Sequence, residues 1–339
     1  MVSLKTIAEK CGVSTATVSK ALNDQKDVSE ETKHRIKKTA EALGYFPNAA
    51  ARALKTNRSY NIGVLFEEEA GSGLTHEYFS GVLNGLKVQA EKQGSDITFI
   101  NTCFENRKMS YYEHCRYRNF EGVAIVCADY NDPDVLELMN SDLPVVTIDY
   151  VHHNCTAVSS NNIQGIEDLV KYIYQQGHRK IAYIHGQENS YVTKDRLASF
   201  YRTMDELGLE VPDEYIRTAD YLETKEAARQ TRELLNLTDV PTCIIYPDDT
   251  ALIGGRNVII EMGLRIPRDI SVAGYDGTRI SQLLHPKLTT IRQNTELIGS
   301  EAAKRLIGTI EKPRTTLVER VVIEGSLVPG QSVGKFLQK

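Results

Sequence analysis

The feature that most constrains the fold is an alternation of two patterns from Tyr60 to the end of the chain. Short apolar runs lie at residues 61–66, 96–101, 122–127, 144–149, 180–185, 242–247 and 270–275. Segments with apolar residues at helical spacing lie between and after them, at residues 79–93, 162–176, 197–207, 250–262 and 295–310. Continuous apolar strands that alternate with helices predict an α/β body of parallel sheets covered by helices on both faces. Roughly ten strand-and-helix units are too many for a single open sheet, so we expect two lobes, each with its own sheet.

The first 58 residues follow a different pattern, which predicts three short helices. Ser3 and Gly12 are placed to begin and end the first helix. Ser14 is placed to begin the second helix, and Ser29 and Gly44 bound the third. Two short helices joined by a three-residue turn are typical of a helix-turn-helix. An ordinary three-helix packing domain is the alternative.

The second of these helices has two distinct faces. Val18, Ala21 and Leu22 fall on one stripe, which predicts its buried side. The opposite stripe is small and hydrogen-bonding, and it contains Thr15, Ala16, Ser19, Lys20 and Asn23. Such a face suits entry into the DNA major groove, which a bulky or acidic face would not fit. A merely solvated polar face is the alternative.

The charge is divided unevenly along the chain. The net charge of −5 taken alone argues weakly against nucleic acid. Residues 1–58, however, hold 11 Lys and Arg against six Asp and Glu, a net charge of +5, so the remainder carries −10. A small basic block on an acidic body is typical of a DNA-reading head joined to a body that does not bind DNA.

The composition excludes several classes of protein. No run approaches the ~18 apolar residues of a membrane span, and the N-terminus lacks the apolar region of a signal peptide. We therefore expect a cytoplasmic protein with no membrane partner. The six cysteines form no CxxC pair, which favours buried free thiols over disulfides or a zinc site. No GxGxxG, P-loop, HExxH or GxSxG motif is present, so we expect no catalytic residue, no cofactor and no metal.

Polar side chains follow the predicted strands, at the positions where ligands bind in open α/β sheets. They are Glu67, Asp149, His185, Gln187, Asp248, Asp249, Asp276 and Gln293. Strand ends are often polar, so each residue alone is a weak candidate, and their convergence on one binding cleft is expected from the two-lobed fold. The acidic run Glu67–Glu69 is expected to be a solvated lip of that cleft, and a cation site is the alternative.

Several longer stretches resemble one known family. LKTIAEKCGVSTATVSKALN (4–23), MGLRIPRDISVAGYD (262–276) and HPKLTTIRQ (285–293) are similar to motifs of the LacI/GalR family of bacterial transcriptional repressors. The resemblance covers essentially the whole chain. It implies an all-α helix-turn-helix headpiece (1–46), a hinge helix or linker (47–59) and a two-lobed, periplasmic-binding-protein-like body (60–339). The lobes are expected at 60–160 with 292–322, and at 161–291 with 323–339.

The resemblance also implies contacts with DNA. In this family the second helix lies in the major groove, and Thr15, Ala16 and Lys20 occupy the matching positions. Lys20 would donate to guanine, and Ala16 would contact a thymine methyl group. The other cations of the headpiece are expected to meet phosphates or solvent, and they include Lys5, Lys26, Lys33 and Arg35.

The segment PNAAARALK (47–55) matches the hinge of the family. The resemblance implies that it becomes helical on the operator and that Leu54 wedges into the minor groove. Arg52 and Lys55 flank Leu54 in the sequence, and we expect them to contact DNA. Packing of Leu54 on its own body is the alternative.

The resemblance supports a set of effector contacts in the cleft. They are Tyr78, Asp149, Arg196, Tyr221, Asp248 and Asp276, and the strand-end residue Gln293 completes the set. Carboxylates and Arg form bidentate bonds to neighbouring hydroxyl groups, and Tyr faces stack on sugar rings, so we expect a carbohydrate effector. The sequence departs from the family in having Ser199 where glycine is usual after RLA and in having no Trp.

Together these features predict a homodimeric, ligand-responsive repressor of carbohydrate-utilisation genes. Its two headpieces would read a palindromic operator. The alternative keeps the same DNA-binding activity under the control of a protein co-regulator or a non-sugar effector such as a purine. A pure solute-binding protein is disfavoured by the missing signal peptide and the basic headpiece.

Overall fold

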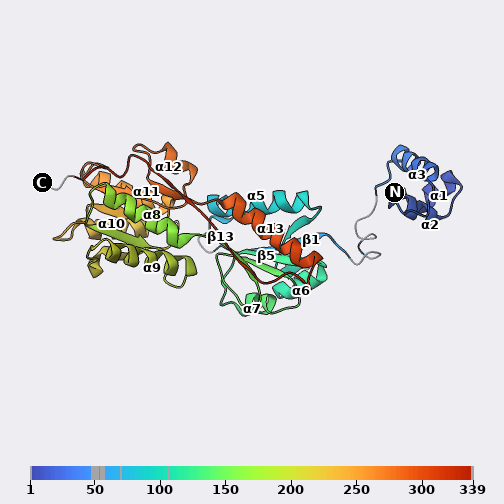
Figure 1. Cartoon of the computed structure of the whole chain (residues 1–339), viewed down its shortest axis with the longest axis horizontal. Coiled ribbons are helices and arrows are strands. Elements are labelled where there is room, and N and C mark those ends of the chain that lie inside the picture. Colours follow the sequence, from blue (N-terminus) through green and yellow to red (C-terminus); the bar gives the residue numbers. More distant parts are fainter. Residues whose placement is uncertain (1, 47–52, 54–57, 69–70, 105–106, 337–339) are drawn as a thin grey trace. The chain divides into compact units, whose positions relative to one another are not determined.

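The structure of the chain is a computed structural model, which describes residues 2–46, 53, 58–68, 71–104 and 107–336. The chain divides into two compact units, Met1–Ser59 and Tyr60–Lys339. Figure 1 shows the described part of the first unit, in dark blue, as helices and the second unit as helices arranged around strands.

Residues 2–46 of the first unit form a three-helix domain with its own core. Its helices are α1 (Leu4–Cys11), α2 (Thr15–Leu22) and α3 (Glu30–Ala42). The core is formed by Ile7, Ala8, Cys11, Val18, Ala21, Val28, Ile36 and Ala40. Gly12 closes α1 with a left-handed φ of 64°, and residues 12–14 join α1 to α2. The predicted helix-turn-helix is confirmed.

Serine caps determine where these helices begin. The hydroxyls of Ser3, Ser14 and Ser29 each accept a hydrogen bond from the backbone N–H three residues later, over 3.3, 3.1 and 3.4 Å. Each bond satisfies an N–H group that the first helical turn leaves unpaired. α2 is therefore helical despite its mediocre helix formers, because Ser14 caps it and Val18 and Ala21 bury its inner face.

Six parallel strands form the larger sheet of the second unit, in the order β13-β7-β6-β5-β1-β2. In that order they span Arg320–Ile323, Thr156–Ser160, Val145–Ile148, Gly122–Cys127, Asn61–Phe66 and Asp96–Phe99. One apolar cluster joins the sheet to α5 (Glu77–Lys92) and α13 (Thr295–Glu311). A second cluster joins it to α6 (Tyr111–Tyr117) and α7 (Pro133–Met139), so helices cover both faces.

Four parallel strands form the smaller sheet, in the order β11-β10-β8-β9. In that order they span Ser271–Ala273, Cys243–Ile245, Ile181–His185 and Ile216–Thr218. One face packs against α10 (Thr224–Leu235) and α11 (Asp249–Glu261), and the other packs against α8 (Asn162–Gln175) and α9 (Tyr191–Glu206).

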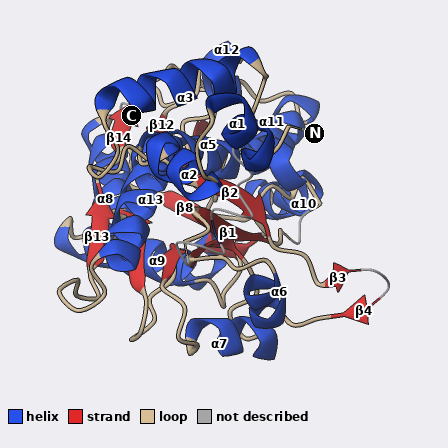
Figure 2. Ribbon diagram, turned by 90° about the vertical axis from the view of Figure 1, so that its right-hand side faces the viewer, coloured by secondary structure: helices blue, strands red, loops and turns tan. Residues whose placement is uncertain are grey.

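Short elements complete the second unit. Strands β12 (Thr290–Arg292) and β14 (Ser326–Val328) form an antiparallel pair, and α12 (Arg279–Leu283) follows β11. The antiparallel strands β3 (Cys103–Phe104) and β4 (Arg107–Lys108) stand apart from both sheets in Figure 2. Two 3-10 turns, η1 (Gly73–Thr75) and η2 (Asp213–Tyr215), precede α5 and β9.

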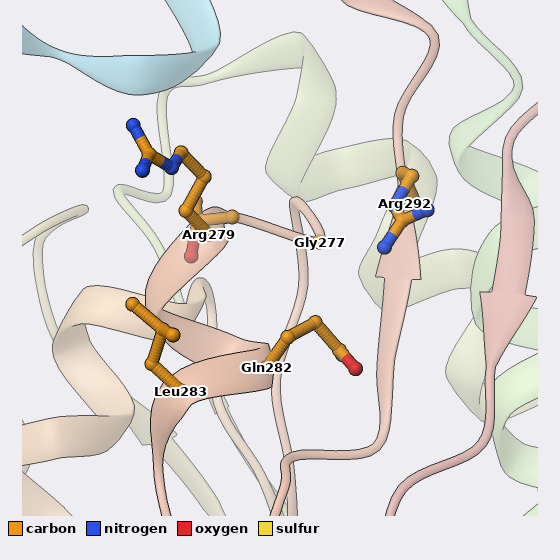
Figure 3. A pocket seen from close by; sticks show the side chains of 6 residues that line it. Gly277, Arg279, Gln282, Leu283 and Arg292 are labelled. Atoms are coloured by element: carbon orange, nitrogen blue, oxygen red, sulfur yellow. The ribbon is translucent and has the colours of Figure 1, made fainter.

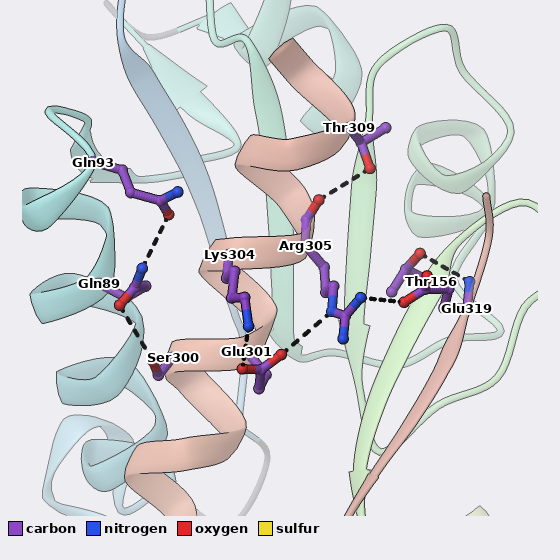
Figure 4. Close-up of polar contacts among 9 residues, drawn as sticks. All are labelled: Gln89, Gln93, Thr156, Ser300, Glu301, Lys304, Arg305, Thr309 and Glu319. Carbon is purple, nitrogen blue, oxygen red and sulfur yellow. Dashed lines mark hydrogen bonds and ion pairs between the residues drawn. The ribbon is translucent and has the colours of Figure 1, made fainter. Parts of the chain in front are cut away.

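Polar contacts tie α13 to the larger sheet, although it comes late in the sequence (Figure 4). Arg305 forms ion pairs with Glu301 on its own helix, at 3.3 Å, and with Glu319 next to β13, at 2.5 Å. The backbone N–H of Glu319 donates to the Thr156 hydroxyl at the start of β7 over 3.2 Å. The chain therefore returns from the smaller sheet to add an edge strand to the larger one.

The predicted body of parallel sheets covered by helices is confirmed. The helix predicted at 197–207 begins earlier, at Tyr191, because the Ser190 hydroxyl accepts from Thr193 N and caps it there. The expectation of buried thiols is wrong for Cys103, which is exposed, and for Cys127, which is half-buried. None of the helices in the described ranges is long and apolar enough to cross a membrane. The boundaries of headpiece, hinge and lobes stay predictions.

Candidate functional site

The face of α2 that we expect to read DNA lies on the surface of the first unit. Ser19 is half-buried, and the exposed members of the set are Thr15, Ala16, Lys20 and Asn23. Val18 and Ala21, on the opposite side of the helix, are fully buried. The fold therefore presents small polar side chains outward without any loss of core contacts.

Lys20 is held by a neighbouring acid on this face. Its ammonium group donates to the Asp27 carboxylate, and this bond lowers the pKa of Asp27 below its ordinary value. Both side chains are about half exposed, at 45% and 52%. Ion pairs at such exposed positions contribute little to stability, so Lys20 can exchange Asp27 for a base or phosphate at small cost.

The expectation that Lys33 meets phosphate or solvent is wrong. Its side chain is only 8% exposed, and its Nζ donates to Glu30 Oε1 over 2.7 Å. Lys33 shares the buried face of α3 with Ile36 and Ala40, so its aliphatic stem covers the core while the ammonium group reaches a surface acid. Lys5, Lys26 and Arg35 are exposed, as a phosphate contact requires.

In the second unit the predicted effector residues gather where strands end. Asp149 follows β6, and the Tyr78 hydroxyl of α5 donates a hydrogen bond to its carboxylate. Asp276 follows β11, and its Oδ1 accepts from Gln293 Nε2 over 2.6 Å. One cavity of about 160 Å³, the cleft cavity, is lined by Glu77, Tyr78, Asp276, Gly277, Thr278, Arg292, Gln293 and Thr295.

Arg196 is buried beside this cavity and held in one orientation. Its Nε donates to Asn162 Oδ1 over 2.8 Å, and its Nη1 donates to the Pro247 carbonyl over 3.0 Å. The guanidinium carbon lies 3.5 Å from the centre of the Tyr275 ring, a stacked cation–π contact. The same carbon lies 5.9 Å from the Tyr221 ring, whose hydroxyl bonds to the Thr193 hydroxyl.

Burial dominates the electrostatics of the carboxylates. It raises the pKa of Asp149 and of Asp276, and it raises the pKa of Tyr78, next to Asp149, well above its ordinary value. Desolvated acids of this kind gain from a ligand that donates hydrogen bonds to them. Within the described residues, no cluster of His, Cys, Asp and Glu is arranged to hold a metal ion.

Asp248 has a structural partner for each oxygen. Its Oδ1 accepts from the backbone N–H groups of Thr250 and Ala251 at the start of α11, over 2.9 and 2.7 Å. Its Oδ2 accepts from Leu222 N over 2.8 Å. The side chain is buried, and desolvation raises its pKa to about 6. These contacts give Asp248 a capping role, and its contact with an effector stays a prediction.

Asp249, next in the chain, holds the loop that carries Asp276. It is fully buried, and its Oδ2 accepts from the backbone N–H and the hydroxyl of Thr278, over 2.8 and 3.0 Å. Desolvation first, and then the charge of Asp276, raise the pKa of Asp249 to about 8. Asp249 therefore ties Thr278, two residues after Asp276, to the start of α11.

The other strand-end residues do not line the cleft cavity. The Nδ1 of His185 donates to the Gly186 carbonyl over 2.8 Å, and its Nε2 lies 3.4 Å from the Thr218 hydroxyl. Glu67 and Gln187 are exposed. Position after a strand therefore found part of the cavity lining and also several residues that lie outside it.

Comparison with known proteins identifies the family. A family model described as bacterial regulatory proteins, lacI family, matches residues 3–48, and a periplasmic binding protein-like domain matches residues 170–333. The HTH-type transcriptional repressor PurR of Mannheimia succiniciproducens is 30% identical over 341 residues, which covers 99% of this chain and 100% of the relative. The chain belongs to the lacI family of bacterial regulatory proteins. The PurR repressor of Aliivibrio salmonicida is also 30% identical, over 92% of this chain and 93% of its own length.

Solved structures of lacI-family regulators agree with this assignment. The lac repressor dimer bound to operator and the anti-inducer ONPF has a TM-score of 0.82 and 26% identity, covering 98% of this chain and 99% of that chain. The transcriptional regulator CelR in complex with cellobiose has a TM-score of 0.69 and 25% identity, covering 98% and 100%. The prediction of a DNA-binding regulator rather than an enzyme is confirmed by this membership.

Part of the predicted DNA site of this lacI-family chain lies outside the described residues. The hinge residues expected to contact DNA fall there, namely Arg52, Leu54 and Lys55. Their roles stay predictions. The α2 face of the headpiece is the portion whose geometry is described.

Three tyrosines that the strand-end rule did not single out form an aromatic cluster next to Asp149 in this lacI-family body. The rings of Tyr130 and Tyr150 stack with centres 3.7 Å apart and planes 4° apart. Tyr191, at the start of α9, meets Tyr150 edge to face at 5.1 Å. Tyr150 directly follows Asp149, so its aromatic ring after β6 was the available signal. These rings offer flat apolar surface in a chain that has no Trp.

Proposed function

We propose that this chain is a homodimeric transcriptional repressor whose affinity for a palindromic operator is controlled by a small molecule bound in the cleft. The observation that carries the proposal is its similarity, over 98% of its length, to an operator-bound lac repressor dimer. The exposed polar face of α2 supports major-groove reading, and the net charge of +5 in residues 1–58 supports phosphate contact.

The effector controls the operator only if it binds two conformations with different affinity. We infer that ligand contacts at Tyr78 and Asp149, from the larger sheet, and at Arg196 and Asp276, from the smaller one, bias the arrangement of the two sheets. That arrangement would favour or disfavour helix formation in the hinge at 47–59.

Among effectors, we propose a purine in place of the carbohydrate first expected. The relatives at 30% identity carry the name PurR, which supports this alternative. The residues are compatible with it: Asp149 and Asp276 can accept from ring N–H or amino groups, and the Tyr221 ring can stack on a planar base. A carbohydrate is the second candidate, because the CelR–cellobiose complex is 25% identical over nearly the whole chain.

A thermal-shift panel on the full chain separates these effectors. Purine bases and nucleosides are compared with mono- and disaccharides, in the wild type and in Asp276→Asn, which removes an anionic acceptor from the cleft cavity. We expect a purine to raise Tm in the wild type and less in the variant, while Asp205→Asn, at an exposed position, leaves the shift intact. A shift with sugars only supports the carbohydrate, and no shift with any compound supports a protein co-regulator.

Mobility shifts on the DNA upstream of the gene test the operator side. Leu54→Ala is expected to weaken binding at least about tenfold if Leu54 wedges into the minor groove, since unstacking contacts of this kind stabilise a bent operator. Leu317→Ala, which alters an exposed leucine of the second unit, serves as a control. Undiminished binding by Leu54→Ala would refute the hinge role and leave the α2 contacts standing.

A further inference from the structure

A larger cavity adjoins the cleft cavity and has no role in the function proposed above. This outer cavity, of about 350 Å³, is lined by Gly277, Thr278, Arg279, Gln282, Leu283 and Arg292 (Figure 3). It shares Gly277, Thr278 and Arg292 with the cleft cavity. The two cavities therefore border the same stretch of backbone, and a ligand longer than the cleft cavity has an adjacent space to enter.

The charges of the two cavities are opposite. The cleft cavity is lined by two acids, Glu77 and Asp276, together with Arg292. The outer cavity is lined by Arg279 and Arg292 and by no acid. Because residues 59–339 carry a net charge of −10, a cavity lined by two arginines and no acid is a distinct feature of this surface, although Glu77 and Asp276 lie next to it in the cleft cavity.

Neither guanidinium group of the outer cavity forms a hydrogen bond or ion pair with any residue that the structure describes. Many other cations of the second unit are paired, among them Lys87, Arg116, Lys171, Lys180, Arg202, Arg229, Arg232, Arg265, Lys304 and Arg305. Arg279 and Arg292 thus keep all of their side-chain donors for an outside acceptor.

The backbone under these arginines is fixed. Gly277 has a φ of 66°, and a Cβ on it would lie 2.5 Å from the Cα and Cβ of Arg292, so only glycine lets the loop pass here. Thr278 is held by Asp249 through two hydrogen bonds. The backbone N–H of Arg279 donates to Glu77 Oε1 over 2.7 Å, which fixes the start of α12 beside α5.

We propose that the outer cavity is an anion subsite that receives the phosphate monoester of a phosphorylated effector whose uncharged part occupies the cleft cavity. This inference rests on the proposed effector cleft. Arginine presents planar, paired N–H donors that match phosphate oxygens, and both arginines retain theirs. The acids of the cleft cavity would repel a phosphate, so the two cavities together orient such a ligand in one direction.

Paired ligands test the subsite by calorimetry on the full chain. Adenosine is compared with adenosine 5′-monophosphate, and glucose with glucose 6-phosphate. The pair that binds also shows whether the phosphorylated effector is a nucleotide or a sugar phosphate. We expect the phosphorylated member of one pair to bind roughly tenfold more tightly than its partner. Arg279→Gln combined with Arg292→Gln should abolish that ratio, and Arg314→Gln, which removes an exposed arginine elsewhere, should preserve it.

The ratio of affinities within a pair distinguishes an error in the proposed anion subsite from an error in the proposed effector cleft. Equal affinity within the pairs, or a preference that survives the double variant, overturns the anion subsite while the effector cleft stands. Asp276→Asn should weaken both members of a pair alike. If no member of either pair binds, the Tm of the full chain is measured in inorganic phosphate and in chloride at equal ionic strength. A higher Tm in phosphate that is lost in the double variant supports the subsite. The absence of a phosphate-specific increase overturns it.

Discussion

At the scale of single residues, Lys20 is a cation that we expect to contact DNA and that is paired with an acid in the structure. Its ammonium group is bonded to Asp27 on the exposed side of α2, and Lys37 is bonded to Asp24 in the same way. Both pairs lie at the surface, where water screens them. The two aspartates therefore allow a matched comparison of a cation predicted to contact DNA bases, Lys20, with a surface cation for which no base contact is predicted, Lys37.

We predict that Asp27→Asn raises operator affinity roughly threefold, because it frees Lys20 and removes one negative charge from the DNA-facing surface. Asp24→Asn changes the net charge equally but frees Lys37 on α3. Fluorescence anisotropy with labelled operator measures both variants. An equal gain from the two would mean that Lys20 contributes net charge and no specific contact.

Asp249 predicts a pH dependence of stability. Its pKa is about 8 in the folded chain against an ordinary value of 3.8, so the folded state binds this proton more tightly than the unfolded state. The free energy of unfolding should then fall as pH rises from about 4 to about 8. Asp249→Asn should remove this fall in the free energy of unfolding, because the amide does not ionise. Its oxygen can still accept the hydrogen bonds from Thr278.

Thermal unfolding without ligand at pH 6 and pH 8 checks this. The wild-type Tm should fall more between these values than the Asp249→Asn Tm, by an amount corresponding to roughly 2 kcal/mol of stability. Asp205→Asn, which removes an exposed carboxylate, should follow the wild type. If Asp249→Asn lost stability as steeply as the wild type, Asp249 would already be ionised at pH 6.

At the scale of elements, α2 depends on its first turn more than on its composition. Ser14→Ala removes the hydroxyl that accepts from Thr17 N and should cost about 1 kcal/mol of helix stability. Amide hydrogen exchange within α2 of the full chain should quicken accordingly, while Ser14→Thr, which keeps a capping hydroxyl, should behave like the wild type. Unchanged exchange in Ser14→Ala would show that core packing alone holds the helix.

Elements with strong periodicity could be predicted from the sequence. The strand predicted at 61–66 is β1 (Asn61–Phe66), and the helix predicted at 162–176 is α8 (Asn162–Gln175). Other features depend on partners distant in the chain. Lys33 is buried because its stem packs on the headpiece core, and β13 (Arg320–Ile323) is a strand because β7 lies alongside it. Local pattern carries no information about such partners.

The candidate site could likewise be predicted where it depends on local position in the sequence, but not where it depends on partners distant in the chain. Asp149 follows a buried strand of the larger sheet and Asp276 follows one of the smaller sheet, so position alone placed each at the carboxyl end of its own sheet. Asp248 follows a strand as well, yet its oxygens are taken by the backbone of α11, which only three-dimensional geometry reveals. The stacking of Tyr130 on Tyr150 joins two loops and likewise has no signature in the sequence.

At the scale of the whole molecule, charge and function are divided between the two units. The first carries a net charge of +5 and the face of α2, and the second carries −10 and the cleft. A basic reading unit should make operator binding fall steeply with salt, whereas ligand binding to the cleft should depend on salt only weakly unless the ligand is charged. Control of one by the other requires coupling between two separate sites.

The most direct test of this account is the affinity of the full chain for its own upstream DNA, measured with and without the ligand found in the thermal-shift panel. We predict sequence-specific binding that weakens with salt, a change of at least about tenfold on adding the ligand, and loss of that change in Asp276→Asn with DNA binding retained. Equal affinity for unrelated DNA, or a ligand effect undiminished in Asp276→Asn, would contradict the account.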